Sequence, residues 1–435
     1  MKRKAISGVM LTLLLMSTLA LAFNIQSVEA EGTIYIRSDG SIEPSTAPIQ
    51  RIGDIYVFTS NIYDPIIVER DNIVVDGAGY TVQNAGSDTG IAMNGRINVT
   101  IRNAVIRGFV HGIKVFLSTM CTLYGNRIEG AASGPGIVIS DSEHNKILDN
   151  TLSNCDHSIN LGHSCYNVID GNNASNNHEG ISLGSFSNDN TIANNVANYN
   201  SGDGILLSGC FNNVVTNNVA DYNGHGGVIL DGGSSENVIS GNMFAGNAYG
   251  IKMHDYSNNN LVVSNTLRNN NNGLELHLSS SNTIYHNNFV SNIGQANAWD
   301  PTSVWDDGYP SGGNYWSNYD GEDVDGDGIG DTPYIIDDYN QDNFPLMEPW
   351  SAPTMIKSLI RTIVFWDLPR GTENSLTAKL QNAIQSLEKG QQNAAINQLN
   401  AFINETQAQR SKKLTTEQAN MLIADAQRII NTIRG

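Results

Sequence analysis

The sequence predicts an all-β solenoid, a parallel β-helix with coils of about 23 residues, followed by a small all-α helical bundle. Three observations carry this prediction. A G-I-x-L motif and an N-x-I motif recur along residues 90–287 at nearly constant spacing. Asn is enriched in the same stretch, with 36 copies in residues 141–300, and Asn is a poor helix former. From residue 355 onward, apolar residues recur at helical spacing instead.

The chain begins with a segment typical of exported proteins. Lys2, Arg3 and Lys4 precede an apolar run from Ile6 to Phe23. With small residues following it, this run predicts a signal peptide over residues 1–30 and an extracellular or cell-surface protein. A retained anchor is the alternative, because the run is close to the length that spans a bilayer.

The composition excludes two classes of protein. The formal net charge is −19, with 43 acidic and 24 basic residues, so the chain would repel nucleic-acid phosphates. After residue 23 no apolar run reaches the roughly 18 residues of a membrane helix, which excludes a polytopic membrane protein. The four cysteines form neither a CxxC motif nor a zinc-like spacing, and we interpret them as buried thiols.

The repeat is predicted to occupy residues 31–292, including an N-terminal entry segment. Within each unit apolar residues alternate with polar ones, which is the period of a strand, and Asn-rich or Gly-rich turns separate three short strands. Stacked units would place Ile and Leu inward and Asn above Asn in hydrogen-bonded ladders. A leucine-rich repeat has a similar period, but no unit leaves room for a helix. The Gly landmark recurs every 22 to 24 residues at Gly90, Gly112, Gly136, Gly180, Gly204, Gly227, Gly250 and Gly273, with a degenerate copy at Ser158.

This pattern resembles the right-handed parallel β-helix repeat proteins, and more narrowly the NosD-like proteins of archaeal cell envelopes. The resemblance covers residues 31–347 and includes Tyr35–Gly40 and Ile73–Gly79. It implies a right-handed, all-β parallel β-helix. The family label also carries an association with copper through a periplasmic accessory role. Because the sequence has no Met-rich or His-rich tract, we do not expect copper as a cofactor.

An acidic and aromatic segment, residues 293–347, follows the last coil. We expect it to cap the β-helix, since an uncovered sheet edge invites aggregation. Stacking of the rings on sugars is the alternative. The aromatic residues are Trp299, Trp305, Tyr309, Tyr315, Trp316, Tyr319, Tyr334 and Phe344.

The same segment contains a candidate calcium loop. Asp323, Asp325 and Asp327 alternate with other residues, and Asp331 follows. Alternating Asp with interleaved Gly lets a chain wrap one cation with oxygen ligands, so the sequence predicts calcium at these four residues. The run resembles EF-hand-like and thrombospondin type 3 calcium loops, although Tyr334 stands where a full EF-hand has Glu. A solvated acidic turn is the alternative.

Residues 348–354 are predicted to be a linker, and residues 355–435 a small antiparallel helical bundle. Thr415 and Gln418 have the spacing of a capping box at the start of its last helix.

This part resembles the FIMAH modules of secreted proteins, on Leu376–Leu380, Ala401–Asn404 and Leu414–Ala419. The resemblance implies adhesion or attachment to a cell surface. A passive spacer is the alternative.

No local catalytic motif is present, so we aligned the coils to find side chains that stacking would bring together. Asp231, His254 and His277 occupy the same position of three successive units and should lie about 5 Å apart. Such groups could move a proton on a uronate, or hold a metal. A chance alignment on a polar surface is the other interpretation. The ionisable residues that flank these three are Lys252, Asp255 and Glu275.

The sequence therefore predicts a monomeric, secreted or cell-surface β-helix protein that serves as a non-catalytic carbohydrate-binding or adhesive scaffold. Its expected partner is an extracellular or envelope polysaccharide. The first alternative is a polysaccharide lyase, hydrolase or C5-epimerase with its site on the β-helix face. The second is a purely structural component of the envelope.

Overall fold

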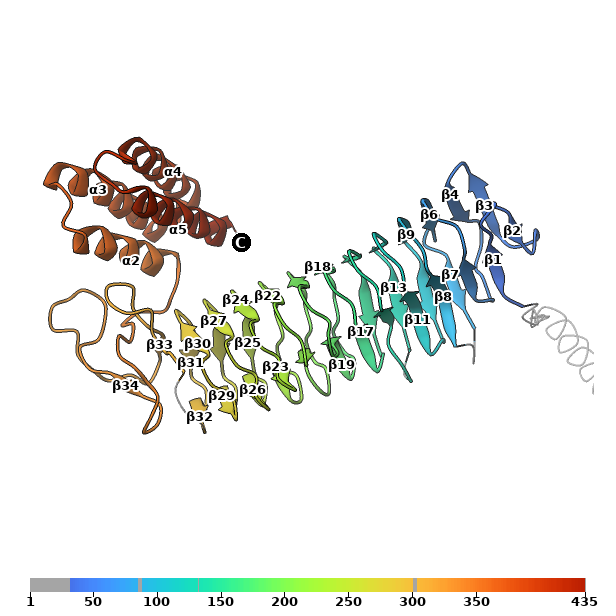
Figure 1. The fold of residues 1–435 in the computed structure, drawn as a ribbon, viewed down its shortest axis with the longest axis horizontal. Helices are drawn as coiled ribbons and strands as arrows, with labels where there is room; N and C mark the ends of the chain where they lie inside the picture. The colour runs from blue at the N-terminus through green and yellow to red at the C-terminus, as the bar shows by residue number, and fades with distance from the viewer. Residues whose placement is uncertain (1–31, 85–87, 132, 300–302, 435) are drawn as a thin grey trace, which may run out of the picture.

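The computed structural model describes residues 32–84, 88–131, 133–299 and 303–434. A long solenoid of stacked coils forms the body, and four helices fold against its C-terminal end (Figure 1). This confirms the predicted parallel β-helix followed by a helical bundle. The predicted signal peptide lies outside the described residues. Among the described residues, no helix is both long and apolar enough to cross a membrane.

The largest face of the solenoid is a 13-stranded sheet, called sheet A here. Its strands run parallel except for β2, which pairs antiparallel with β1 at the N-terminal end. In spatial order the strands are β2 (Ile42–Glu43), β1 (Ile34–Ile36), β5 (Ile66–Val68), β8 (Thr89–Asn94), β11 (His111–Phe116), β14 (Ile137–Ser140), β17 (His157–Gly162), β19 (Glu179–Leu183), β21 (Ile205–Ser208), β23 (Gly226–Asp231), β26 (Tyr249–His254), β29 (Asn272–His277) and β32 (Gly294–Ala298).

A 12-stranded sheet, sheet B, forms the second face. It is parallel except for the antiparallel pair β3 and β4. Its strands are β3 (Ile49–Ile52), β4 (Ile55–Phe58), β6 (Ile73–Asp76), β9 (Val99–Arg102), β12 (Thr122–Tyr124), β15 (Lys146–Leu148), β18 (Val168–Asp170), β20 (Thr191–Ala193), β22 (Val214–Thr216), β24 (Val238–Ser240), β27 (Leu261–Val263) and β30 (Thr283–Tyr285).

The third face, sheet C, consists of two four-stranded parallel sheets joined by isolated bridges from Thr151 through Asn173, Val196 and Val219 to Met243. Its strands are β7 (Thr81–Gln83), β10 (Val105–Arg107), β13 (Arg127–Glu129) and β16 (Thr151–Ser153), then β25 (Met243–Ala245), β28 (Thr266–Arg268), β31 (Asn288–Val290) and β33 (Tyr315–Trp316). A short antiparallel pair, β34 (Tyr334–Ile335) and β35 (Gln341–Asp342), lies in the segment beyond the last coil.

The core is a set of aliphatic columns that run along the solenoid. One column consists of Ile181, Ile205, Val228, Ile251 and Leu274, which are register partners in successive strands of sheet A. All five are fully buried. The glycine before each of them lies so close to the next coil that a Cβ atom would clash. At Gly180, a Cβ would lie 2.2 Å from the carbonyl oxygen of Gly204. Gly in the G-I-x-L motif therefore sets the spacing between coils.

Buried Asn side chains form three ladders at the turns, as the sequence predicts. In each ladder the carboxamide oxygen of one Asn accepts the backbone N–H of the Asn one coil earlier, at 2.7–3.0 Å. These bonds satisfy backbone donors that the turns would otherwise bury without a partner. The ladders are Asn126–Asn150–Asn172–Asn195–Asn218–Asn242–Asn265–Asn287–Asn314, Asn145–Asn167–Asn190–Asn213–Asn237–Asn260–Asn282 and Asn177–Asn200–Asn223–Asn247–Asn270–Asn292.

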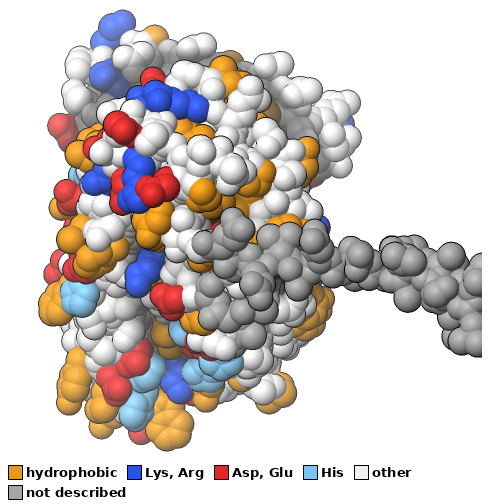
Figure 2. All heavy atoms as spheres, turned by 90° about the vertical axis from the view of Figure 1, so that its right-hand side faces the viewer, with side chains coloured by type: hydrophobic (Ala, Val, Ile, Leu, Met, Phe, Trp, Pro, Cys, Tyr) orange, Lys and Arg blue, Asp and Glu red, His pale blue; other side chains and the backbone are white. Residues whose placement is uncertain are grey.

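At the N-terminal end of the solenoid, basic and acidic side chains lie beside one another (Figure 2). In the first coils Arg70 forms an ion pair with Asp54 at 2.7 Å. At the other end, Trp316 stacks on Phe289 of the last coil and Tyr334 stacks on Trp316, with ring centroids 4.2 Å apart in each pair. These rings extend the core beyond the last coil.

The C-terminal helices are α2 (Ala352–Phe365), α3 (Arg370–Glu388), α4 (Gln392–Gln409) and α5 (Thr416–Arg434). The bundle has its own apolar core. The predicted capping box before α5 is confirmed, because Thr415 N–H donates to Gln418 Oε1 at 2.9 Å and Gln418 N–H donates to Thr415 Oγ1 at 3.1 Å.

Hydrogen bonds made by Arg361 and Trp350 help to hold the bundle against the solenoid and its cap. The guanidinium of Arg361 on α2 donates to the carbonyl oxygens of Pro310, Ser311 and Asp327 at 3.1–3.2 Å. The indole N–H of Trp350, just before α2, donates to Ser264 Oγ at 3.2 Å. The helices are therefore held against the C-terminal coils and the segment that caps them.

Candidate functional site

The predicted cluster on sheet A comes together in part. His254 Nδ1 lies 3.5 Å from Asp231 Oδ1 and 3.5 Å from Asp255 Oδ2. These three residues offer ligand atoms that all lie within 4.8 Å of one another. They lie at the carboxyl ends of β23 and β26, on the outer face of the sheet. His277 pairs in register with His254 on β29 but does not join the three.

The other two predicted residues form a separate pair. Lys252 Nζ lies 3.2 Å from Glu275 Oε1, and both side chains are largely shielded from solvent. Lys252 also lies over the ring of Tyr249, 4.4 Å from its centroid. This cation is therefore already neutralised by its own neighbour.

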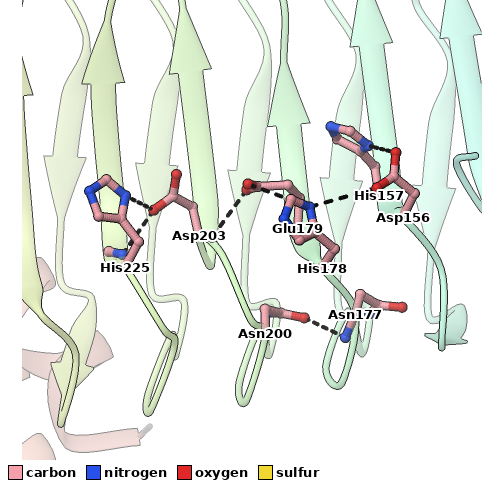
Figure 3. A network of polar contacts seen from close by, with 9 residues as sticks. Asp156, His157, Asn177, His178, Glu179, Asn200, Asp203 and His225 are labelled. Carbon is pink, nitrogen blue, oxygen red and sulfur yellow. Dashed lines mark hydrogen bonds and ion pairs between the residues drawn. The ribbon is translucent and has the colours of Figure 1, made fainter.

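The structure brings together a larger set that our alignment missed, which we call the ionisable strip. It lies at the starts of the sheet A strands, where four successive coils each contribute a carboxylate, an imidazole or both (Figure 3). In the end-on view of Figure 2, histidine side chains gather beside acidic ones along one edge of the molecule. The strip consists of Asp156, His157, His178, Glu179, Asp203 and His225.

The centre of the strip is a chain of short polar contacts. His225 Nδ1 lies 2.8 Å from Asp203 Oδ1, which also accepts the Gly226 N–H at 2.8 Å. Glu179 Oε2 accepts the Asp203 N–H at 3.1 Å. With Nδ1 donating to the carboxylate, a neutral His225 ring carries its free acceptor on Nε2.

Histidines and one carboxylate complete the N-terminal half of the strip. Asp156 lies 3.1 Å from His157 Nδ1 and 3.6 Å from His178 Nδ1. At the other end, the ring of His225 meets the edge of Tyr249 with centroids 5.3 Å apart. Contacts therefore continue from the strip to the Lys252 pair.

Two carboxyl groups of the strip are embedded in the sheet. The side chains of Glu179 and Asp203 are 13% and 9% exposed. Burial raises the pKa of Glu179 to about 7, and the carboxylates of Asp203 and Asp156 add to the rise. Burial also raises the pKa of Asp203, although the charge and the hydrogen bond of His225 oppose the change. Near neutral pH the Glu179 carboxyl group can therefore both hold and release a proton.

The sequence does contain a signal for this strip. Our alignment compared the fifth residue of each G-I-x-L unit, whereas the strip occupies the one or two residues before the Gly. At those positions His157, Glu179, Asp203 and Tyr249 follow one another in successive or nearly successive coils. Aligning the residues before the Gly would have found the strip.

The predicted calcium loop forms a compact acidic group. Carboxylate oxygens of Asp323, Asp325 and Asp327 lie within 4.8 Å of one another. Asp323 also accepts the backbone N–H groups of Gly326 and Gly328 at 2.8 Å each. These hard oxygen donors suit a divalent cation such as calcium.

Asp331, the fourth predicted ligand, has a different role in the described residues. It accepts the Val324 N–H at 2.7 Å and does not belong to the compact group. Beside the loop, the Arg361 guanidinium donates to the Asp327 carbonyl oxygen. The loop therefore touches the helix that anchors the C-terminal bundle.

A buried carboxyl group holds the aromatic segment together. Asp342 accepts the Trp316 indole N–H at 2.8 Å and the Asn314 N–H at 2.7 Å. Burial raises its pKa to about 7 despite these bonds. By contrast, Trp299 is 69% exposed and Tyr309 is 50% exposed, so the predicted aromatic group divides between the interior and the surface.

Comparison with protein families identifies both parts of the chain. The profile described as periplasmic copper-binding protein (NosD) matches residues 47–198, 131–276 and 185–321, which together exceed half of the chain. The chain belongs to the NosD family. The FIMAH domain profile matches residues 354–431, in agreement with the resemblance noted above. No curated protein matches the chain.

Several solved β-helix structures show a low similarity to this NosD-family chain. The periplasmic alginate epimerase AlgG is 16% identical over 62% of this chain and 72% of its own, with a TM-score of 0.44. The A-module of the mannuronan C-5 epimerase AlgE4 from Azotobacter vinelandii is 14% identical over 57% and 88%, with a TM-score of 0.39. The exopolygalacturonase from Thermotoga maritima is 13% identical over 59% and 74%, with a TM-score of 0.38. Similarities of this size assign no activity to the chain.

The donors in the structure do not fit the copper in the family's description. Cu(I) prefers thiolate and thioether ligands, but burial raises the pKa of the Cys155 and Cys210 thiols to about 11, which keeps them protonated. Cu(II) is typically held by several imidazoles. Among the described residues, the compact donor groups are the one around His254, with one imidazole and two carboxylates, and the three aspartates of the acidic loop. We therefore assign no role to copper in this chain.

Proposed function

We propose that this chain is an extracytoplasmic NosD-family protein that binds a neutral glycan along the outer face of sheet A. The observation that carries the proposal is the burial of Glu179 and Asp203 within the ionisable strip. Moving a carboxylate out of water costs several kcal/mol. Side chains kept only for solubility would stay exposed, whereas a hydroxyl-rich ligand supplies hydrogen-bond donors to these acceptors.

The charge of the strip favours a neutral ligand over an acidic one. The strip contains carboxylates and imidazoles but no Lys or Arg, and Lys252, which lies over Tyr249 beside the strip, is paired with Glu275. A uronate would meet repulsion from the strip without a free cation to offset it. Sugar hydroxyls, in contrast, donate to carboxylate oxygens and to neutral imidazole nitrogens.

Two further considerations support a location outside the cytoplasm. The family description refers to a periplasmic protein. The N-terminal segment has the pattern of an export signal. The FIMAH-like bundle, in this proposal, attaches the β-helix to a surface so that sheet A meets polysaccharide in the envelope or its surroundings.

Retention on immobilised neutral polysaccharides tests the binding proposal. We expect the purified chain to be retained on at least one polysaccharide, and the variant Glu179→Ala/Asp203→Ala to lose that retention. The matched control is Asp141→Ala/Glu143→Ala, which removes two exposed carboxylates one coil before the strip. Equal retention of both variants would refute the proposal. No retention of the parent chain on any polysaccharide would instead favour a structural role.

A second candidate function is hydrolysis of the bound glycan, and the raised pKa of Glu179 favours it. A protonated Glu179 can donate its proton to the glycosidic oxygen as the bond to the anomeric carbon breaks. His225, held by Asp203, can accept a proton from the water that attacks that carbon. New reducing ends that disappear in Glu179→Gln would establish an enzyme, whereas retention without new ends would leave a binding protein.

The predicted cluster of Asp231, His254 and His277, with Asp255 beside it, remains an alternative catalytic or metal site on the same sheet. In our proposal it lies at the margin of the glycan surface. The variant His254→Ala/His277→Ala separates the two sites, because loss of product formation in this variant alone would move the chemistry from the strip to the cluster.

We also propose that Asp323, Asp325 and Asp327 bind calcium, with Asp331 holding the loop in shape. The compact oxygen donors support this site. A bound cation would tighten the loop against α2, since Arg361 contacts the Asp327 carbonyl oxygen. In this proposal calcium has a structural role at the junction between the β-helix and the bundle.

A further inference from the structure

The C-terminal bundle and the solenoid enclose a groove that the repeat and the helical periodicity do not predict. Its volume is about 1040 Å³. Sheet B and the adjoining turns form the floor, with contributions from β22, β24, β27 and β30. Trp350 and the C-terminal half of α5 form the opposite wall. In Figure 1 the end of α5 lies over these strands.

The floor of the groove is rich in hydroxyl and amide groups from successive coils. Thr216 and Ser240 occupy the same register position of β22 and β24, and Ser240 Oγ donates to Thr216 Oγ1 at 3.1 Å. Asn217 and Ser264 line the turn beside them, and Thr266 lies on the start of β28. Donors and acceptors repeated at the coil spacing of about 4.8 Å suit an extended, polyhydroxylated chain.

The charge of the groove is opposite to that of the protein. Among the described residues that line it, the charged ones are Arg428 and Arg434, both on α5. The whole chain carries a net charge of −19. Arg428 is 64% exposed and makes one ion pair, with Asp425 at 3.3 Å, which leaves further guanidinium N–H groups free to bind.

The wall that carries these arginines is fixed in place. Trp350 N–H donates to Asn288 Oδ1 at 2.6 Å, and its carbonyl oxygen accepts from Asn288 Nδ2 at 3.0 Å. The Trp350 ring stacks on His286 with centroids 3.5 Å apart. The groove is therefore a built feature of the junction, because these contacts determine where α5 lies relative to sheet B.

We infer that this groove binds an anionic oligosaccharide, with sugar hydroxyls on the sheet B floor and carboxylate or sulfate groups on Arg428 and Arg434. The inference does not depend on the glycan site proposed on sheet A, which lies on another face and has the opposite charge. It gives the C-terminal module a direct part in ligand recognition. The protein would then hold a neutral glycan on one face and an acidic glycan under its bundle.

Binding of defined hexasaccharides to the full chain tests this inference. The probes are galacturonate, mannuronate and chondroitin sulfate hexamers, with maltohexaose as the neutral probe and a single-stranded hexanucleotide as the non-sugar anion. We expect at least one acidic hexasaccharide to bind. In Arg428→Gln/Arg434→Gln its affinity should fall about tenfold or more, as expected for the loss of two charged contacts at a ligand.

The control Lys412→Gln/Lys413→Gln removes the same charge from an exposed turn of the bundle and should bind like the parent chain. A second pair of variants blocks the floor. Thr216→Trp fills the groove, and Leu148→Trp places the same ring at the equivalent register position three coils away. Only the former should abolish binding.

Four results with the groove variants, the control variants and the probes would each overturn the inference. These are absence of binding by every acidic hexasaccharide, equal loss in the arginine and lysine variants, equal or tighter binding of the hexanucleotide, and unchanged affinity in Thr216→Trp. The variant Glu179→Ala/Asp203→Ala separates this site from the one on sheet A. If the Glu179→Ala/Asp203→Ala variant lost as much affinity for acidic hexasaccharides as Arg428→Gln/Arg434→Gln does, the groove would not be the binding site for these ligands.

Discussion

The substitution Glu179→Gln should change how the stability of the β-helix depends on pH. The pKa of Glu179 is about 7 in the folded chain, against an ordinary value of 4.5. Between these two values the folded state binds more protons than the unfolded state, so stability is greatest below about pH 4.5 and falls as pH rises toward 7. Gln cannot ionise, yet its side-chain oxygen can still accept the Asp203 N–H.

The size of the effect follows from the two pKa values. The difference between the folded and unfolded pKa of Glu179 lowers the free energy of unfolding by roughly 1 kcal/mol at pH 5 and by roughly 3 kcal/mol at pH 8. The 13% exposure of the side chain means that solvent screens little of this difference. Relative to the parent chain, Glu179→Gln should therefore gain about 2 to 3 kcal/mol of stability between pH 5 and pH 8.

Urea denaturation followed by circular dichroism at pH 5 and pH 8 measures this gain. Glu143→Gln is the control, because Glu143 is exposed and lies two coils before β19. This substitution should change the free energy of unfolding by the same amount at both pH values. If the stabilities of the parent chain and of Glu179→Gln differed by the same amount at both pH values, the reasoning from burial would be refuted.

Three further predictions follow from the turns, the acidic loop and the junction. Asn195→Ala should lower the free energy of unfolding by about 3 kcal/mol or more in urea denaturation. It removes hydrogen bonds to Asn172, Ile169 and Asn218 and leaves buried groups unpaired. The exposed control Asn271→Ala should change the stability little. A loss below about 1 kcal/mol would contradict the structural role of the ladder. Calcium should raise the Tm of the parent chain and of the control Asp320→Asn, but not that of Asp325→Asn. At a calcium concentration a hundredfold above Kd, the free energy of unfolding of the parent chain should rise by about 3 kcal/mol. An equal rise in Asp325→Asn would exclude the proposed loop. Trp350→Ala should speed proteolytic cleavage between the β-helix and α2, because the bond to Ser264 and the stack on His286 are lost, while Trp299→Ala should not. Equal cleavage rates would show that Trp350 does not hold the bundle.

The fold was largely predictable because its determinants are local and repeated. The Gly of the G-I-x-L motif, the inward Ile and Leu and the turn Asn recur in most coils, so each copy supports the same interpretation. Gly180 and Asn195 do in the structure what the pattern indicates, in close packing and in a ladder bond. The capping box at Thr415 was predictable for the same reason, since its two bonds lie within four residues.

The candidate site was less accessible because its contacts join coils at positions that the repeat does not conserve. Asp231, His254 and Asp255 were found where strand register is regular. Glu179 lies at the start of its strand, and Asp203 and His225 lie just before theirs. The turns there decide which side chains meet, and the G-I-x-L and N-x-I motifs do not describe those turns.

The groove was beyond sequence reasoning altogether. Arg428 and Thr216 are 212 positions apart in the sequence, and they share a groove through the docking of Trp350 and α2. Helical periodicity predicts which face of α5 is apolar, but it does not say where the bundle comes to rest on the solenoid.

The central claim is that sheet A binds a neutral glycan over the ionisable strip. A crystal structure of the chain soaked with the neutral oligosaccharide that retains it best tests this claim most directly. We predict sugar electron density along successive coils of sheet A, with hydroxyl groups within hydrogen-bonding distance of Glu179 and Asp203. Density confined to another face, with the strip bearing water alone, would contradict the account.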